Sequence, residues 1–226
     1  LLTNLLALKF GLSFIEGSDE LNKIRKEIDE KLDIALKEQV FEDGGHFERS
    51  FMYTLITTSM ILDIINIKVG DKYKPIAGRM LSFINAFTSS DKIPLFNDAG
   101  DNITYYPSEL LFMGKSLGLE IEWMKPKTKV FQKSNFAVLS DFKRTIYIDG
   151  GGFPPFQPGH AHSSALSFEL YDRGRKLFYD SGCKDYENNS ERTFLRSSKA
   201  HNTISVDNND QHEMWKSFRI ASRGEN

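Results

Sequence analysis

The chain has 226 residues, which is enough for one large hydrophobic core or two smaller ones. Hydrophobic residues make up 40%, aromatic residues 12% and charged residues 27% of the chain, a globular composition that excludes a disordered tail. The 29 lysines and arginines against 31 aspartates and glutamates give a formal net charge of -2, so no global charge steers the protein toward nucleic acid or an anionic membrane.

The single cysteine, Cys183, excludes an intrachain disulfide and a cysteine-rich zinc framework. Residues 1–15 are apolar enough to resemble a signal peptide, but they have no basic leader and no small-residue cleavage site, so we predict a buried helix there. No uninterrupted apolar run reaches about 18 residues, so no membrane span is predicted.

The first half of the chain, up to about residue 124, has helical periodicity. The clearest helix covers residues 19–40, because Leu21, Ile24 and Ile28 recur at steps of three and four and Ser18 is suited to cap the N-terminus. Antiparallel helical hairpins are the expected assembly. The other helices predicted here cover the start of the chain and residues 48–67, 73–87 and 108–117.

The second half, after Pro126-Lys127, changes to short β-rich runs with a period of two, and Asp172-Arg173-Gly174 is a predicted turn. We therefore predict an α+β multidomain protein, with a helical portion in residues 1–125 and an antiparallel β-sandwich portion in residues 126–226. The loop 89–106 is expected to line a cleft between them. The predicted strands cover residues 129–139, 145–148, 165–171, 176–179, 203–206 and 218–221.

Two histidines in the second half, His160 and His162, stand two residues apart, which places both imidazoles on one face of an extended chain. Asp180 and His201 complete a two-histidine, one-carboxylate set if their strands are neighbours, and such a set suits Zn²⁺. On spacing alone, half-buried structural histidines and an aspartate that caps a turn are the favoured interpretation.

In the first half, His46, Arg49 and Tyr53 lie at steps of three and four and share a face if the segment is helical. A phenol beside a guanidinium and an imidazole is suited to proton transfer, because neighbouring cations favour the phenolate. On spacing alone, a structural network at the helix end, with Glu48 and Arg49 satisfying the backbone and each other, is the favoured interpretation.

The ordered motifs nevertheless resemble one known family, the heparinase II/III-like polysaccharide lyases. The likeness covers almost the whole chain, and the set of motifs is far more specific than any single one. The segments that carry it are PGHAHSSALSFEL (158–170), DSG (180–182), AHNTISVD (200–207) and DQHEMW (210–215), with DGGHFERSFMY (43–53) in the helical half.

The resemblance implies an (α/α) toroid of helical hairpins followed by an antiparallel β-sandwich, with a glycan in the cleft between them. It also implies that Tyr53 and His160 are the catalytic tyrosine and histidine. His162, Asp180 and His201 match the zinc ligands of the family, and we expect this zinc to be structural. Too few helices are present for a complete toroid, so we expect a fragment that lacks the Asn or His pair that neutralises the substrate carboxylate.

The implied activity is β-elimination on a uronic-acid-containing polysaccharide such as a glycosaminoglycan, alginate or a bacterial exopolysaccharide, with Tyr53 and His160 as acid and base. His46, Arg49 and Asn97, with Asp98 as an alternative, are expected to contact this anionic substrate. A periplasmic or secreted location is expected, although its signal is not in this chain. Two alternatives remain, a zinc-dependent hydrolase and a non-catalytic glycan-binding protein.

Overall fold

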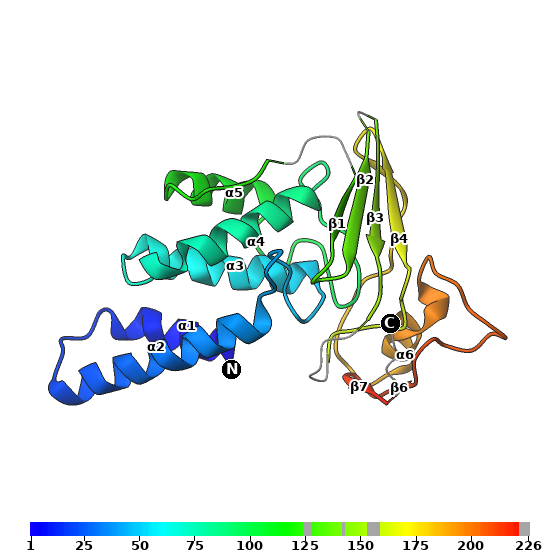
Figure 1. Ribbon diagram of the computed structural model, residues 1–226. Helices are drawn as coiled ribbons and strands as arrows, with labels where there is room; N and C mark the ends of the chain where they lie inside the picture. The colour runs from blue at the N-terminus through cyan, green and yellow to red at the C-terminus, as the bar shows by residue number, and fades with distance from the viewer. Residues whose placement is uncertain (124–127, 142, 153–158, 222–226) are drawn as a thin grey trace.

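The computed structural model describes residues 1–123, 128–141, 143–152 and 159–221, and shows a layer of helices packed against one face of an antiparallel sheet (Figure 1). The predicted mixed α+β class is confirmed. The predicted domain boundary at residues 125 and 126 lies outside the described residues. Among those residues, no helix is both long and apolar enough to cross a membrane.

Five helices form the first layer, and their local sequence explains where they begin. The hydroxyl of Ser18 accepts a hydrogen bond from the backbone N–H of Leu21 at 3.2 Å, which is the predicted N-cap. Pro75 and Pro107 lie in the first turn of their helices, where a missing N–H costs nothing. The helices are α1 (Leu2–Leu12), α2 (Asp19–Gln39), α3 (Phe51–Asn66), α4 (Lys74–Ala86, after a 3-10 turn at Asp71–Tyr73) and α5 (Pro107–Ser116).

The predicted start of the third helix at residue 48 is wrong. Arg49 has a φ of 59°, in the left-handed region, so the chain turns sharply there instead of entering the helix. Ser50 is the N-cap, and its hydroxyl accepts from the N–H of Tyr53 at 3.4 Å. His46 and Arg49 therefore precede α3 and share no helical face with Tyr53.

Five strands form one sheet in the order β1-β2-β3-β4-β5, and every neighbouring pair is antiparallel. The predicted strand 129–139 is a hairpin of two strands, because a turn interrupts it before Phe136. The predicted turn at Asp172-Arg173-Gly174 is confirmed, with φ of 48° at Arg173 and 77° at Gly174. The strands are β1 (Lys129–Phe131), β2 (Phe136–Ser140), β3 (Arg144–Asp149), β4 (Phe168–Asp172) and β5 (Arg175–Phe178).

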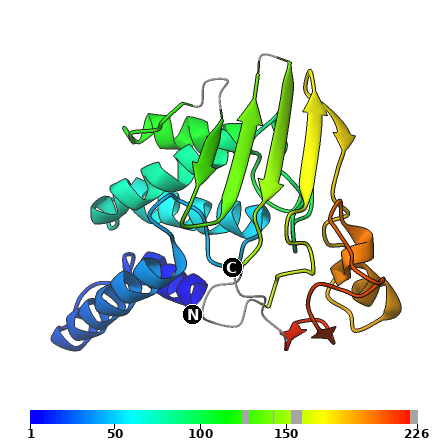
Figure 2. The ribbon, with the colours of Figure 1, turned by 45° about the vertical axis from the view of Figure 1, so that its right-hand side comes forward.

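The residues after β5 fold beside the β4–β5 side of the sheet, as the orange and red segments of Figure 2 show. They contain α6 (Ser190–Arg196), a 3-10 turn (Ser198–Ala200) and a small hairpin of β6 (Met214–Trp215) and β7 (Arg219–Ile220). The predicted strand 203–206 is wrong, because this segment makes only an isolated bridge between Val206 and Asn209. α6 was not predicted.

A cluster of phenylalanines joins the helices to the sheet. The ring of Phe51 in α3 lies 5.4 Å from that of Phe83 in α4 and 5.1 Å from that of Phe136 in β2, between ring centroids. Phe87, which follows α4, lies 5.1 Å from Phe131 in β1. These rings are at most 3% exposed. Both halves therefore share one hydrophobic core.

The Asp43-Gly44-Gly45 turn holds the loop before α3 against this core. A Cβ on Gly44 would lie 2.2 Å from the backbone oxygen of Arg79, so only glycine fits. The carboxylate of Asp43 accepts hydrogen bonds from the backbone N–H of Lys133 and of Ser134, at 3.0 and 2.8 Å. The loop before α3 is thus attached to the β1–β2 turn.

We expect Phe51→Ala to lower the free energy of unfolding by about 3–5 kcal/mol, because the variant leaves a cavity where the helices meet the sheet. Phe112→Ala is the matched control, since Phe112 is 74% exposed and should change stability by less than about 0.5 kcal/mol. Guanidinium unfolding followed by circular dichroism measures both. Equal losses in the two variants would contradict a shared core.

Candidate active site

The structure brings Tyr53 and His160 together where the helical layer meets the β-rich half. Tyr53 lies in the first turn of α3, and its ring centroid is 4.2 Å from that of His160. The hydroxyl of Ser50 accepts from Tyr53 N–H and donates to the backbone oxygen of Asp98 at 2.7 Å, so this turn is fixed to the loop after α4. The imidazole of His160 is 20% exposed.

Asp98 is the centre of the polar contacts around the two histidines. Its carboxylate accepts from Nδ1 of His160 at 2.9 Å and from Nε2 of His162 at 2.7 Å. The guanidinium of Arg192, in α6, donates to both oxygens of the same carboxylate. Burial acts to raise the pKa of Asp98, but the hydrogen bonds from these three side chains outweigh it and hold the pKa well below its usual range.

The two-residue spacing predicted that His160 and His162 lie on one face of a strand, and this prediction is wrong. The segment is irregular, and the two rings reach the same carboxylate through different nitrogens. His162 is buried, whereas His160 is partly open to solvent. Contacts with a distant loop explain why the segment is not a strand. The backbone N–H of Asp98 donates to the backbone oxygen of His160, and Asn97 Oδ1 accepts from His162 N–H.

Arg49 and Asn97, which we expected to contact substrate, have side chains engaged within the protein. The buried guanidinium of Arg49 forms an ion pair with Asp149 and donates to the oxygen of Ser134 at 2.6 Å. Asn97 donates to the oxygen of Arg49 at 2.9 Å and to the carboxylate of Asp149 at 3.1 Å. Both side chains therefore position the loops around the site.

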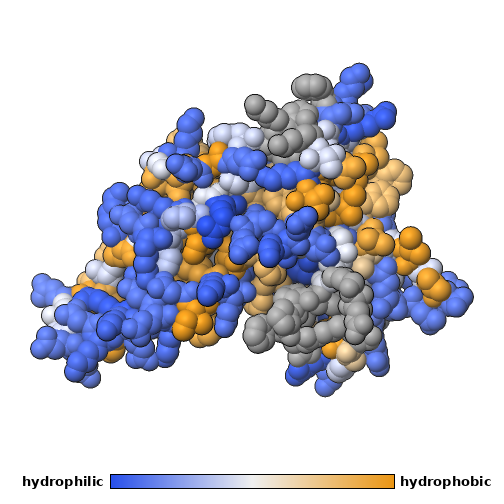
Figure 3. Space-filling model, in the orientation of Figure 1, coloured by the Kyte–Doolittle hydropathy of each residue, from blue (hydrophilic) through white to orange (hydrophobic). Residues whose placement is uncertain are grey.

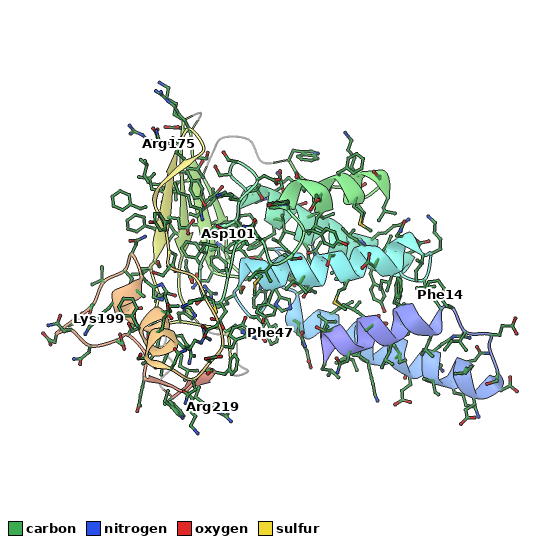
Figure 4. All side chains as sticks on the ribbon, turned by 180° about the vertical axis from the view of Figure 1, so that it is seen from behind. Phe14, Phe47, Asp101, Arg175, Lys199 and Arg219 are labelled. Carbon is green, nitrogen blue, oxygen red and sulfur yellow. The ribbon has the colours of Figure 1, made fainter. Side chains whose placement is uncertain are left out.

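His46 is also buried, at 5% exposure, and its Nδ1 accepts from the N–H of Glu48 at 3.3 Å. Burial, assisted by the charge on His160, lowers the pKa of His46 from 6.5 to about 3. Phe47, whose ring lies 5.1 Å from that of His46, is labelled in Figure 4 at the junction of the helices and the C-terminal segments.

Two aromatic side chains that the sequence analysis did not single out also lie against His160. Tyr186 shares a hydrogen bond with the hydroxyl of Tyr53 at 2.9 Å, and its ring lies 5.6 Å from that of His160. Phe218 lies 5.6 Å from His160 and 5.3 Å from Tyr186. Arg192 packs over both rings. No spacing relates these residues to Tyr53, because folding alone brings them together.

The protonation of Tyr53 differs from the sequence-based expectation. Burial raises the pKa of Tyr53, and the hydrogen bond from Tyr186 only partly opposes it. The expected lowering by Arg49 is wrong, because that guanidinium faces Asp149 and Ser134 instead. The phenol of Tyr53 is therefore protonated at neutral pH and is a proton donor.

The three predicted zinc ligands lie in one buried region. The carboxylate of Asp180 accepts from Nδ1 of His201 at 2.8 Å, and the rings of His162 and His201 are 5.2 Å apart between centroids. Nδ1 of His162 and Nε2 of His201 are buried and have no hydrogen-bond partner. Among the described residues, however, no three His, Cys, Asp or Glu side chains converge as a set of metal ligands.

Comparison with known proteins relates the β-rich half of the chain to one family. Residues 124–226 match the family model of the heparinase II/III-like C-terminal domain. The β-rich half of the chain is therefore similar to this domain. No curated protein sequence matches the chain.

Solved heparinases share the fold of the β-rich half of this chain and of the helices before it. One heparinase III gene product superimposes with a TM-score of 0.73 at 23% identity, over 96% of this chain and 38% of its own. A crystal structure of heparinase III superimposes with a TM-score of 0.76 at 17% identity, over 96% of this chain and 40% of its own. Heparan sulfate lyase HepC from Pedobacter heparinus superimposes with a TM-score of 0.69 at 19% identity, over 92% of this chain and 37% of its own. The chain thus spans 37–40% of the length of these three proteins.

We expect the free energy of unfolding to decrease as the pH falls below about 6.5, because the unfolded chain protonates His46 near 6.5 whereas the folded chain does so only near 3. His46→Gln removes this difference in proton uptake, so its stability should fall less steeply between pH 6.5 and 4. Urea unfolding at a series of pH values measures both slopes. Parallel slopes would show that His46 titrates alike in the folded and unfolded chains.

Proposed function

We propose that this chain is part of a polysaccharide lyase that cleaves a uronic-acid-containing glycan by β-elimination. The observation that carries the proposal is the contact of Tyr53 with His160, a protonated phenol against an imidazole that is partly open to solvent. The names of the solved relatives, heparinase III and heparan sulfate lyase, favour a sulfated glycosaminoglycan over alginate or an exopolysaccharide.

The reaction requires one group to remove the C5 proton of the uronate and another to protonate the departing C4 oxygen. We assign the second role to Tyr53, because its raised pKa keeps the phenolic proton available for donation. His160 is then the base that receives the C5 proton. Its ring is held by Asp98 on one side and flanked by Tyr53, so both groups reach one sugar residue.

The substrate carboxylate must also be neutralised, because the C5 proton is only weakly acidic. Arg49 and Arg192 are unsuited to this role, since both guanidinium groups are buried and paired with aspartates. We propose that the neutralising side chains come from a segment of the longer protein, as the family resemblance implies.

A structural zinc fits the buried histidine pair. The unpartnered nitrogens of His162 and His201 are suitable donors, and a bound zinc would satisfy both. Asp180, at 2.8 Å from His201, either joins as the third ligand or orients His201. Bound there, zinc would cross-link the segment that carries His160 to the segment after α6, without taking part in the elimination.

The longer protein is proposed to complete a β-sandwich over the outer face of the sheet. Strand register places only apolar residues on the central part of that face, and Val130 and Phe178 are 60% and 52% exposed. Hydrophobic atoms gather there at the right of Figure 3. Such a patch is typical of a surface that another element covers. Its members are Val130, Ala137, Leu139, Ile146, Ile148, Phe168, Leu170 and Phe178.

The helical layer is proposed to be one part of an (α/α) toroid. Residues 1–125 would then belong to the toroid and residues 126–226 to the β-sandwich. Leu8, Phe14, Ile34 and Phe112 project from the helical half with 50–74% exposure, as expected where further helices pack. We also propose a periplasmic or extracellular location, because a polysaccharide substrate would be met there.

We expect Tyr53→Phe in the longer protein to lower lyase activity by about 10²-fold or more, because the variant has no proton for the leaving oxygen. Tyr105→Phe is the matched control, since Tyr105 is an exposed loop tyrosine. The assay is near-ultraviolet absorbance of the unsaturated uronate, with heparan sulfate, alginate and other uronate polymers as substrates. Cleavage without this absorbance would indicate a hydrolase, and binding without any cleavage would indicate a glycan-binding protein.

We expect elemental analysis to find about one zinc per chain. His201→Ala should lose this zinc and lower the thermal midpoint, and chelation of the wild-type protein should do the same. His46→Gln serves as the control, because His46 contacts none of the three proposed ligands in the described structure. Zinc that persists in His201→Ala would place the metal elsewhere.

A further inference from the structure

Asp98 brings together side chains from three distant parts of the chain. It lies in the loop after α4 and is fully buried, yet it touches His160, His162 and Arg192, which follow it by 62, 64 and 94 residues. Its main chain is fixed as well, because its N–H donates to the oxygen of His160 and its oxygen accepts from the hydroxyl of Ser50. The carboxylate therefore has one orientation.

The chemistry of these partners determines which atoms carry hydrogen. A guanidinium donates hydrogen bonds and cannot accept them, and Arg192 donates to both oxygens of Asp98. Both oxygens are therefore acceptors, and each nitrogen that faces them must be a donor. Nδ1 of His160 and Nε2 of His162 both face the carboxylate, so both carry a hydrogen.

We propose that Asp98 is a positioning residue that holds His160 and His162 in opposite tautomers. His160 keeps its hydrogen on Nδ1, which leaves the lone pair of Nε2 for a proton taken from substrate. His162 keeps its hydrogen on Nε2, which leaves the lone pair of Nδ1 in the buried space beside His201. One carboxylate thus sets the chemical character of both rings.

Arg192 holds this carboxylate in place. Its guanidinium also donates to the backbone oxygen of Ser217 and lies 5.2 and 5.7 Å from the ring centroids of Tyr186 and Phe218. Its side chain is 1% exposed. The Asp98 carboxylate is therefore held on one side by a rigid cation and on the other by two imidazoles, and rotation of either ring would break a buried hydrogen bond.

The tautomers can be read directly by long-range ¹H–¹⁵N correlation spectra of the protein labelled with ¹⁵N-histidine. The chain has five histidines, and single His→Gln variants assign their signals. We expect the protonated nitrogen to be Nδ1 in His160 and Nε2 in His162. The opposite tautomer, or a mixture of tautomers, in either ring of the wild-type protein would overturn the proposal.

Asp98→Asn tests whether the carboxylate sets the two tautomers. The amide of asparagine has one oxygen and one NH₂ group, so it can no longer accept hydrogen bonds from both rings. We expect at least one of the two histidines to change tautomer. Asp149→Asn is the matched control, because Asp149 is an equally buried carboxylate that pairs with Arg49 and touches neither histidine. The Asp149→Asn variant should be less stable than the wild type, but its His160 and His162 should keep their wild-type tautomers. Unchanged tautomers in folded Asp98→Asn would remove Asp98 from this role.

The consequence for turnover rests on the proposed function. In the longer protein, Asp98→Asn should lower kcat about 10²- to 10⁴-fold, with KM changed only a few-fold, because the substitution misorients the ring that accepts the proton and leaves the other substrate contacts unchanged. An unchanged kcat in a folded variant would overturn the catalytic part of the proposal. If the tautomers are as stated but the wild-type longer protein cleaves no uronate polymer, the lyase assignment fails while the positioning role of Asp98 stands.

Discussion

The buried carboxylate of Asp98, paired with Arg192, is the contact on which the geometry of the site depends. An ion pair of this kind adds little net stability, because both charges lose their hydration, but removal of one partner costs about 3–5 kcal/mol. The phenylalanine cluster around Phe51 packs the helices against the sheet, and burial of these rings stabilises that junction. The two contributions differ in kind: apolar packing tolerates small shifts, whereas the hydrogen bonds of Asp98 admit one arrangement of His160 and α3.

The parts of the fold that local sequence controls were predictable. α2 follows from a regular apolar repeat with a serine cap, and the β4–β5 hairpin follows from a turn ending in Gly174. The errors occur where distant contacts override local preference. α3 begins three residues later than predicted because the left-handed Arg49 reaches Asp149, a partner 100 residues away. α6, with only seven residues, has too short a repeat to stand out.

The candidate site was predictable only in its membership. Family-like motifs pointed to Tyr53, His160, His162 and His201, and the structure brings them into one region. Spacing could not reveal their partners, because Asp98 lies in an irregular loop whose composition resembles any turn-rich segment. For the same reason Arg49 and Asn97 were expected at the substrate, whereas their polar groups serve buried connections between loops.

The environment of Tyr53 indicates which of the two proposed catalytic roles, acid or base, this residue would take. A tyrosine that acts first as a base requires a phenolate, and a phenolate requires nearby positive charge. Here the guanidinium groups of Arg49 and Arg192 are neutralised by Asp149 and Asp98, and burial raises the pKa of the phenol. Tyr186 supplies only a neutral hydroxyl at 2.9 Å. We therefore infer that Tyr53 begins the reaction protonated, so the C5 proton must pass to another group. His160, with one nitrogen bound to Asp98 and its ring against the phenol, is the group placed to receive it.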